Sequence, residues 1–286
     1  VKIIKRIFVV TLTLVMALST FMMNASETKA LDIFPFVVLA TGNVRGQLVP
    51  FKYGPSINEG GLTKAATVID QIRMETTNRE GYSMLIDAGN TLFGSDLATY
   101  YTQKPMAGKP HPVVSVMNKL KYDAAGYTSL DFSMPQQIRD ARKRESDFTW
   151  VCTNAYKSGS LYVSDHRMLV YDVPNSAHVL KIAVISLPDP SRINAIPKES
   201  ISGIEFYDPV EEVIRSSDVL KEIERADFII LLTDLKWETD PEKREDSFLN
   251  EILHRSRIDI CISSADDPIS GEQALYSSTD EFPEHD

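Results

Sequence analysis

The chain has 286 residues, of which 43% are hydrophobic and 24% charged, and its formal net charge is −10. This apolar content is ample for the core of one large domain or two small ones. The negative charge argues against a nucleic-acid polymer or an anionic membrane surface as the partner, because both require a basic face.

The N-terminal segment has the features of a targeting sequence. Three basic residues precede an uncharged apolar run at 7–23, and Ala25 or Ala30 offers a small residue for cleavage. This pattern predicts a signal peptide over residues 1–30 and therefore a secreted, extracytoplasmic protein. The run is also close to the minimum length that spans a bilayer, so an uncleaved membrane anchor is the alternative.

Strand and helix patterns alternate along the rest of the chain. A buried strand at 34–40, an amphipathic helix at 60–78 and a strand at 82–89 form a βαβ unit, which is typical of a parallel sheet. The following patterns predict, in order, helix 111–120, strand 122–127, helix 135–145, strand 148–155, an antiparallel pair at 161–173 and 179–189, helix 208–226, strand 227–235, helix 244–256 and strand 258–266. We therefore expect one α/β domain over 31–279, followed by a solvated acidic tail at 280–286.

Ligand chemistry in open α/β sheets collects beyond the carboxyl ends of the strands. This rule selects the turns at 42–46, 87–90, 126–131, 153–154, 233–234 and 263–267.

The two cysteines, Cys152 and Cys261, each lie in an apolar strand-like run. They could pair in an oxidising compartment or remain buried free thiols, and the sequence leaves both alternatives open.

Seven framework segments occur in an order and spacing that resemble a known family. They are "VVLATGNVRGQL", "GGLTKAATVIDQIR", "LIDAGNTLFGSDLA", "HPVVSVMNKLKYDA", "GIEFYDPVEEV", "ADFIILLTDL" and "IDICISSAD". From about Phe36 to Asp267 the chain resembles the N-terminal metallophosphatase domain of the secreted 5′-nucleotidase and cyclic-nucleotide phosphodiesterase family, within the calcineurin-like superfamily. The resemblance implies two packed mixed β-sheets flanked by helices in four αββα layers, and a pair of divalent metal ions that activates water.

The first two turns depart from the family's metal-binding pattern. Where the family has Asp-x-His-Gly this chain reads "NVRG", so Asn43 replaces an Asp and Arg45 replaces a His. An arginine stays protonated and cannot bind a metal ion. Where the family has Asp-x-Gly-Asp the chain reads "DAGN", so Asn90 replaces the carboxylate that would bridge the two metals, whereas Asp87 remains in a supporting position.

The later turns depart in the same way. Ser129 replaces an Asn ligand and Leu130 replaces a catalytic His. Asp234 replaces a His ligand, and Ala265 and Asp267 stand where two further His would bind. None of the chain's five His falls on a ligand position, and we expect each to be a surface or loop residue. The inherited two-metal site is therefore predicted to be dismantled, with no metal bound and no catalytic residue.

A second departure lies at the end of the chain. In the family, further strands and then a nucleotide-binding domain follow the last metal turn, whereas only 19 residues follow Asp267 here. We therefore expect the C-terminal strands to be truncated, and a protein partner could pair with the exposed sheet edge.

Three interpretations follow. The first is a secreted pseudoenzyme that acts as a binding or scaffolding module and needs no cofactor. The second is a metal-free binder of a phosphate or nucleotide, in which Arg45 holds the phosphate. The third is a phosphoesterase with an altered metal site, in which Asp131, Asp234 and Asp267 supply oxygen ligands that suit Mg or Ca. Residual activity would then use a divalent cation such as Mn, Zn or Mg. The vestigial pocket would comprise Asn43, Arg45, Asn90, Ser129, Asn154, Asp234 and Asp267.

Overall fold

The computed structural model describes residues 34–53, 56–58, 60–103, 109–238, 240–244 and 247–265. By its internal contacts the chain divides into the units Val1–Phe34 and Pro35–Asp286, and the description below concerns the second. The predicted signal peptide, the acidic tail and Asp267 lie outside the described residues. In the part of the chain that is described, no helix combines the length and apolar character needed to cross a membrane.

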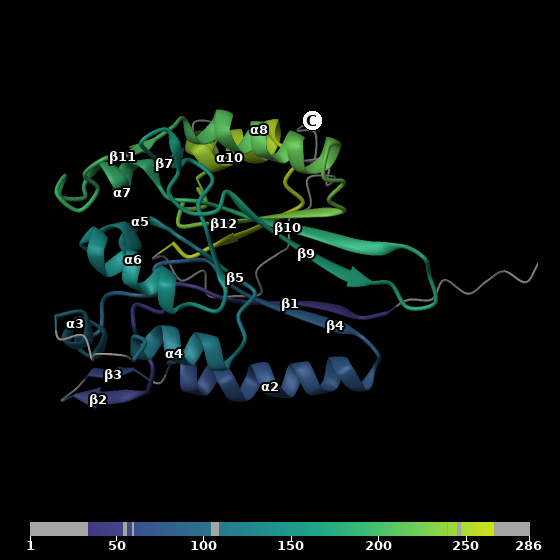
Figure 1. Cartoon of the computed structure of the whole chain (residues 1–286), viewed down its shortest axis with the longest axis horizontal. Coiled ribbons are helices and arrows are strands. Elements are labelled where there is room, and N and C mark those ends of the chain that lie inside the picture. The colour runs from purple at the N-terminus through teal and green to yellow at the C-terminus, as the bar shows by residue number, and fades with distance from the viewer. Residues whose placement is uncertain are drawn as a thin grey trace, which may run out of the picture. The chain divides into compact units, whose positions relative to one another are not determined.

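The first sheet has four strands in the order β1-β4-β5-β6, and all of its strand pairs are parallel. Helical crossovers join these strands, and α2 and α4 lie along the outer face of the sheet (Figure 1). The elements are β1 (Phe36–Thr41), α2 (Leu62–Asn78), β4 (Tyr82–Asp87), α4 (Pro112–Lys119), β5 (Ala124–Gly126), α6 (Gln136–Glu145) and β6 (Thr149–Val151).

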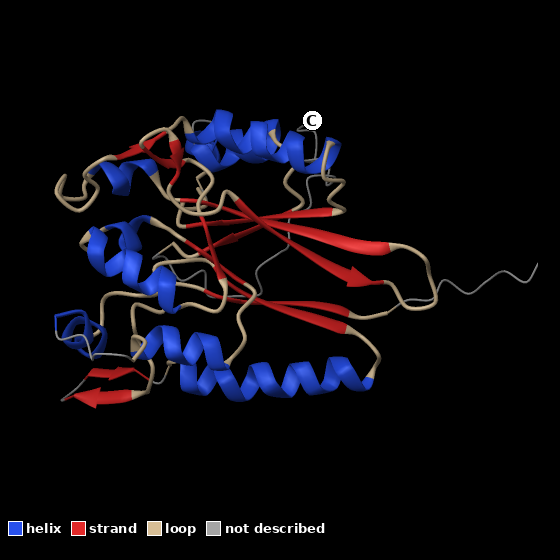
Figure 2. Ribbon diagram, in the orientation of Figure 1, coloured by secondary structure: helices blue, strands red, loops and turns tan. Residues whose placement is uncertain are grey.

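The second sheet has the order β13-β12-β10-β9 and is mixed, because β9 and β10 form an antiparallel pair while the other pairs are parallel. Helices α8 and α10 cover its outer face (Figure 2). The elements are β9 (His166–Asp172), β10 (Val179–Leu187), α8 (Pro209–Glu222), β12 (Phe228–Thr233), α10 (Phe248–Arg255) and β13 (Ile260–Ser263).

The two sheets pack face to face through apolar side chains of their central strands. Met84 and Ile86 of β4 meet Ile182 of β10 and Leu232 of β12 in one buried cluster. The predicted α/β class, with two packed sheets between helices, is confirmed. One detail differs from the expectation of two mixed sheets, because each link between neighbouring strands of the first sheet contains a helix and so returns the chain in the same direction.

The shorter elements were not predicted. Except for one helix of eight residues, each of them has two to five residues, which carry too little periodicity. Among them, β7, β8 and β11 form a small separate sheet. The predicted strand 148–155 is divided, since β6 ends at Val151 and β7 belongs to that other sheet. The short elements are β2 (Phe51–Tyr53), β3 (Ser56–Asn58), α3 (Asp96–Gln103), α5 (Ser129–Phe132), β7 (Ala155–Lys157), β8 (Ser160–Leu161), α7 (Pro190–Asn194), β11 (Ile204–Phe206) and α9 (Pro241–Arg244).

Two further expectations are decided by burial. Cys152 is buried, Cys261 is half-buried and both are free thiols, and burial raises the pKa of each to about 12. His111 lies in the loop before α4, within the expectation that every His is a surface or loop residue, yet it is buried: it is 3% exposed and caps α4 by accepting a hydrogen bond from Val113 N. Desolvation lowers the pKa of His111 to about 4, so the ring is neutral.

The pair of sheets is bridged along one side and has two outer strands along the other. At one side, Val151 of β6 forms an isolated β-bridge with Ser164, which precedes β9, so the two sheets are joined there. At the other side, β1 and β13 are the outer strands of the described sheets, and the inward side chains of Phe36 and Ile260 are only half-buried. A partner at this edge stays a prediction.

Candidate functional site

The turn after β4 is built around a buried carboxyl group. Asp87 accepts hydrogen bonds from Gly89 N at 2.9 Å, from Thr91 Oγ1 at 2.7 Å and from Thr41 Oγ1 at 2.5 Å. These contacts hold the chain in a turn in which Gly89 has φ +92° and Asn90 has φ +56°. Burial raises the pKa of Asp87 to about 7, although the three donors oppose the shift.

The side chain of Asn90 is fully engaged inside the protein. It is 1% exposed, and its Oδ1 accepts hydrogen bonds from Thr128 Oγ1 at 3.1 Å and from Leu130 N at 2.9 Å. Its Nδ2 donates to Asp234 Oδ2 at 3.4 Å. An amide nitrogen has no lone pair for a metal ion, so the Nδ2 group that Asn90 directs at Asp234 can donate a hydrogen bond but cannot bind a metal.

Asp234 joins the ends of both sheets. Its Oδ1 accepts from Asp189 N at 2.7 Å, and its Oδ2 accepts from Ser129 N at 3.2 Å as well as from Asn90. Asp189 and Asp234 follow strands of the second sheet, whereas Asn90 and Ser129 follow strands of the first. A single buried carboxyl group therefore fastens the carboxyl ends of the two sheets together, and burial raises its pKa.

Asp131 is the third buried carboxylate of this region. It lies in the first turn of α5 and forms a capping box with Thr128. It also accepts from the backbone N–H groups of Asn90 at 3.0 Å, Thr91 at 3.3 Å and Leu92 at 3.2 Å. Burial is the main cause that raises its pKa to about 6, and the neighbouring Asp234 adds to the shift.

The first turn is fastened to the second through the backbone. Asn43 N donates to Gly89 O at 2.8 Å, and Arg45 N donates to Asn90 O at 3.0 Å. Asn43 and Arg45 both have left-handed backbone conformations, with φ +53° and +51°. Arg45 Nε donates to Asn43 Oδ1 at 2.7 Å, while the arginine side chain remains exposed.

The predicted pocket residues are thus brought together only in part. Asn90, Ser129 and Asp234 are in direct contact, and the turn of Asn43 and Arg45 is paired with the turn of Asn90. Asn154 is engaged elsewhere, because its Nδ2 donates to Tyr207 O at 3.0 Å.

Sequence reasoning missed Asp189 and Thr128 as members of this network. Asp189 precedes Pro190 and caps α7 by accepting from Ser191 N, just as Asp208 precedes Pro209 and caps α8. The Asp-Pro signal was therefore present at both positions.

These residues do not fit a pair of metal ions. Over the described ranges, no three or more His, Cys, Asp or Glu side chains are grouped so that they could hold a metal ion. Both oxygens of Asp131 and of Asp234 already accept hydrogen bonds from the protein. Asn90 directs an N–H group at Asp234, and Arg45 adds a fixed positive charge nearby.

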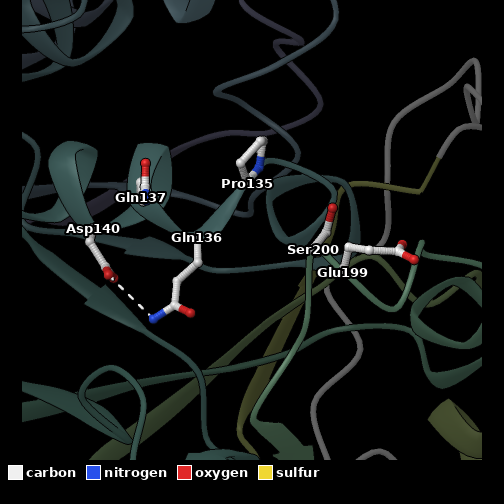
Figure 3. Close-up of a pocket in the computed structure, with 6 residues that line it drawn as sticks. All are labelled: Pro135, Gln136, Gln137, Asp140, Glu199 and Ser200. Atoms are coloured by element: carbon white, nitrogen blue, oxygen red, sulfur yellow. Dashed lines mark hydrogen bonds between the residues drawn. The ribbon is translucent and has the colours of Figure 1, made fainter.

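A hollow of about 590 Å³ lies at the N-terminal end of α6 (Figure 3). Five of its six lining residues have polar side chains, and Gln136 Nε2 donates to Asp140 Oδ2 at 3.4 Å. None of the predicted pocket residues lines it. The lining residues are Pro135, Gln136, Gln137, Asp140, Glu199 and Ser200.

Comparison with known proteins finds sequences and a solved structure that this chain resembles. No protein-family model matches the chain. The 5′-nucleotidase of Vibrio vulnificus is 29% identical over 209 residues, and the trifunctional nucleotide phosphoesterase YfkN of Bacillus subtilis is 26% identical over 255 residues. The crystal structure of calcineurin-like phosphoesterase YfkN from Bacillus subtilis superposes with a TM-score of 0.68, at 24% identity, over 79% of this chain and 70% of that chain.

The chain has the fold of the 5′-nucleotidase metallophosphatase domain. The resemblance drawn from the seven framework segments is confirmed. The matched region is 72% of this chain but 35% of the Vibrio protein, and 84% of this chain but 17% of the Bacillus sequence. The chain therefore spans a minor part of the length of these relatives.

Proposed function

We propose that this protein is an extracytoplasmic binding module built on the metallophosphatase fold, and that it does not hydrolyse phosphoesters by a two-metal mechanism. The observation that carries the proposal is the hydrogen bond from Asn90 Nδ2 to Asp234 Oδ2. In a two-metal site these two positions require lone pairs that converge on cations. Here they form a donor and an acceptor for each other.

The energetics support the same conclusion. Asp234 Oδ2 already accepts from Ser129 N and from Asn90 Nδ2, so a cation at that oxygen would displace one of these buried donors, and a buried donor left without a partner costs about 1–3 kcal/mol. Asn90 also carries no negative charge where the family has a carboxylate. Two adjacent dications bound here would therefore have about one negative charge less to balance them. The extracytoplasmic location is supported by the signal-like pattern at 1–30.

The test is a phosphoesterase assay combined with metal analysis of the full chain. Adenosine 5′-monophosphate and a generic phosphodiester are offered with Mn, Zn, Mg or Ca, and a working 5′-nucleotidase is assayed in parallel. We expect no chelator-sensitive turnover and no stoichiometric metal. Turnover that a chelator abolishes, and that Asp234→Ala removes in a variant that remains folded, would overturn the proposal.

A second candidate function is metal-free phosphate binding at Arg45. It is favoured by one observation, which is that Arg45 Nε is fastened to Asn43 Oδ1 while the side chain stays exposed beside the turn. A guanidinium held in this way is oriented to hydrogen-bond phosphate oxygens.

Phosphate that binds at Arg45 should raise the melting temperature of the folded protein. Arg45→Ala should abolish that rise, and Arg79→Ala, at an exposed position in the turn after α2, serves as the matched control. No rise at millimolar phosphate or nucleotide, or a rise that Arg45→Ala leaves intact, rejects this candidate.

A further inference from the structure

Strand β9 has an open edge over most of its length. Among the described strands it pairs with β10 alone, and the bridge to β6 uses Ser164, which precedes β9. Opposite Val170, Lys181 of β10 donates its N–H to Asp227 Oδ2 at 2.7 Å, and its C=O accepts from Asp227 N at 2.8 Å. Asp227 precedes β12, on the side of β10 away from β9. Val170 and Lys181 therefore share no hydrogen bond, and the N–H and C=O of Val170 point away from β10.

The same phase holds along the strand. Hydrogen-bonded and non-hydrogen-bonded pairs alternate in an antiparallel ladder, so the backbone groups of Met168 and Asp172 point to the open edge with those of Val170. His166 has this phase too, and its N–H is capped by Asp165 Oδ1 at 2.9 Å. For Met168, Val170 and Asp172, no residue in the described part of the chain hydrogen-bonds the outward N–H or C=O. The edge thus presents a row of unused donors and acceptors.

The middle of this edge lacks the features that normally keep edge strands from pairing. The ladder with β10 is continuous over seven residue pairs, so β9 contains no bulge, and residues 168–171 include no charge and no proline. Val170 is 55% exposed, and Val179, its diagonal neighbour on the same face of the sheet, is 41% exposed. The two strands run out together past the end of α8 (Figure 1). A strand that added to β9 would therefore also cover apolar side chains.

The sequence of β9, "HRMLVYD", is complementary to itself when two copies run antiparallel about Leu169. In this register Met168 lies opposite the second copy's Val170, and His166 lies opposite the second copy's Asp172. All four residues carry outward backbone groups, so both opposed pairs have the phase of hydrogen-bonded pairs. An apolar side chain meets an apolar one and a basic residue meets an acidic one, and the symmetry repeats each contact.

The neighbouring registers satisfy only part of this pattern. An axis at Val170 would set Asp172 opposite Met168, and an axis at Met168 would set His166 opposite Val170. Both keep the hydrogen-bond phase, but each places a polar or charged side chain against an apolar one. Hydrogen-bond phase and side-chain pairing therefore agree at Leu169.

The charge at the basic end of the strand comes mainly from Arg167. His166 already contacts the carboxylates of Asp165 at 3.0 Å and Glu224 at 3.3 Å. Arg167 is exposed and forms no ion pair within the described ranges. An antiparallel second copy would bring Asp172 close to this guanidinium, well within the distance over which salt leaves charges unscreened.

We propose that β9 pairs with β9 of a second copy of this chain, antiparallel about Leu169, so that the two four-stranded sheets join into one. The partner is a second copy because the edge matches its own sequence in hydrogen-bond phase, apolar contact and charge. The inference goes beyond the proposed function, since this interface needs neither phosphate nor metal. A contact through one strand is small, so the association should be weak and concentration-dependent.

The test is sedimentation velocity of the full chain from micromolar to near-millimolar concentration. We expect a reversible equilibrium between monomer and dimer. Val170→Lys should weaken the dimer about tenfold, because the symmetry repeats the lost apolar pair. Val170→Thr keeps the branched shape and adds no charge, so it should still dimerise. Val68→Lys, at a position 56% exposed on α2, is the matched control and should leave the equilibrium unchanged.

Cysteine crosslinking tests the register. Met168→Cys and Val170→Cys are oxidised separately and then as a mixture. About an axis at Leu169, these positions in different copies form a hydrogen-bonded pair with Cα atoms about 5.5 Å apart, which is within the range of a disulfide. The mixture should give a crosslinked dimer. The wild type, with its own Cys152 and Cys261, and each variant alone should not.

Three results would overturn the inference. A monomer at every concentration would exclude the second copy, even if a strand of another protein adds to β9. A dimer that Val170→Lys leaves intact would belong to another surface, such as the edge of β1 and β13. A crosslink formed by Val170→Cys alone would move the axis away from Leu169. Melting temperatures of the variants separate lost pairing from lost folding, and none of these readouts involves phosphoester hydrolysis, so the inference and the proposed function fail separately.

Discussion

Asp87→Asn should stabilise this protein at alkaline pH and do so less at acidic pH. The carboxyl group is buried, and burial raises its pKa from 3.8 to about 7. Because the folded-state pKa lies above the unfolded value, the group's contribution to stability is complete below the unfolded pKa and is lost as the pH rises through the folded pKa. An asparagine has nearly the same shape and does not titrate.

The magnitude follows from the shift. Between about pH 5 and about pH 8 the wild type should lose about 3 kcal/mol of stability through Asp87, since each pKa unit corresponds to about 1.4 kcal/mol. In the variant, Oδ1 can still accept from Gly89 and Thr91. The Thr41 hydroxyl can turn to accept from the new amide and donate to the Tyr122 hydroxyl, which lies 2.9 Å away.

The assay is urea unfolding at both pH values, followed by the fluorescence of the chain's two tryptophans, of which Trp150 is buried. The effect of the substitution on the free energy of unfolding should become more favourable to the variant at the higher pH. A variant that is destabilised more at about pH 8 than at about pH 5 would refute the reasoning. It would show that the ionised carboxylate gains more from its three donors than burial costs.

Three further predictions concern the same scaffold. Asp234→Ala should lower the free energy of unfolding by about 2–4 kcal/mol, because two buried backbone donors lose their acceptor; a loss below about 1 kcal/mol in chemical denaturation would contradict the crosslinking role. Gly89→Ala should cost at least about 3 kcal/mol, since its Cβ would lie 2.1 Å from Thr128 Oγ1 at φ +92°, whereas Gly159→Ala, at φ +75° with no atom within 4 Å, should cost about 1 kcal/mol. Equal losses of stability in the two variants would show that the turn at Gly89 can rearrange to accommodate a Cβ. His166→Gln should destabilise only in acid, because the hydrogen bond with Asp165 raises the pKa of His166 and its contribution is lost as the pH rises through that raised value; melting temperatures across pH that show equal effects in acid and base would contradict this.

The elements that could be predicted are those whose signals are local. The helix α8 follows from Asp208 at its cap, Pro209 in its first turn and apolar residues at helical spacing, and the structure has all three. The antiparallel pair β9 and β10 follows from two apolar runs around a turn at 174–178. In both cases the residues that decide the conformation lie within one segment.

The parts that could not be predicted depend on partners far apart in the chain. The resemblance correctly indicated that turns after neighbouring strands would meet, but it could not show that Asn90 and Asp234, 144 positions apart, bond to each other. In the same way, Asn154 was assigned to the pocket from its position after a strand, whereas its amide is used by Tyr207, 53 positions away. The burial of His111 also depends on distant partners, because its Nε2 lies 3.3 Å from Ala98 O and its backbone N–H donates to Glu145 Oε2 at 2.9 Å.

The contact between Asn90 and Asp234 also limits how this sequence can change. Restoring a carboxylate by Asn90→Asp alone would set a second acid 3.4 Å from Asp234 and remove the donor between them, so the intermediate would suffer repulsion before any cation could offset it. Changing Asp234 first would leave the N–H groups of Asp189 and Ser129 without an acceptor. Each single substitution toward a carboxylate-bridged metal centre is therefore expected to lower the stability of the protein, so two or more changes would have to occur together.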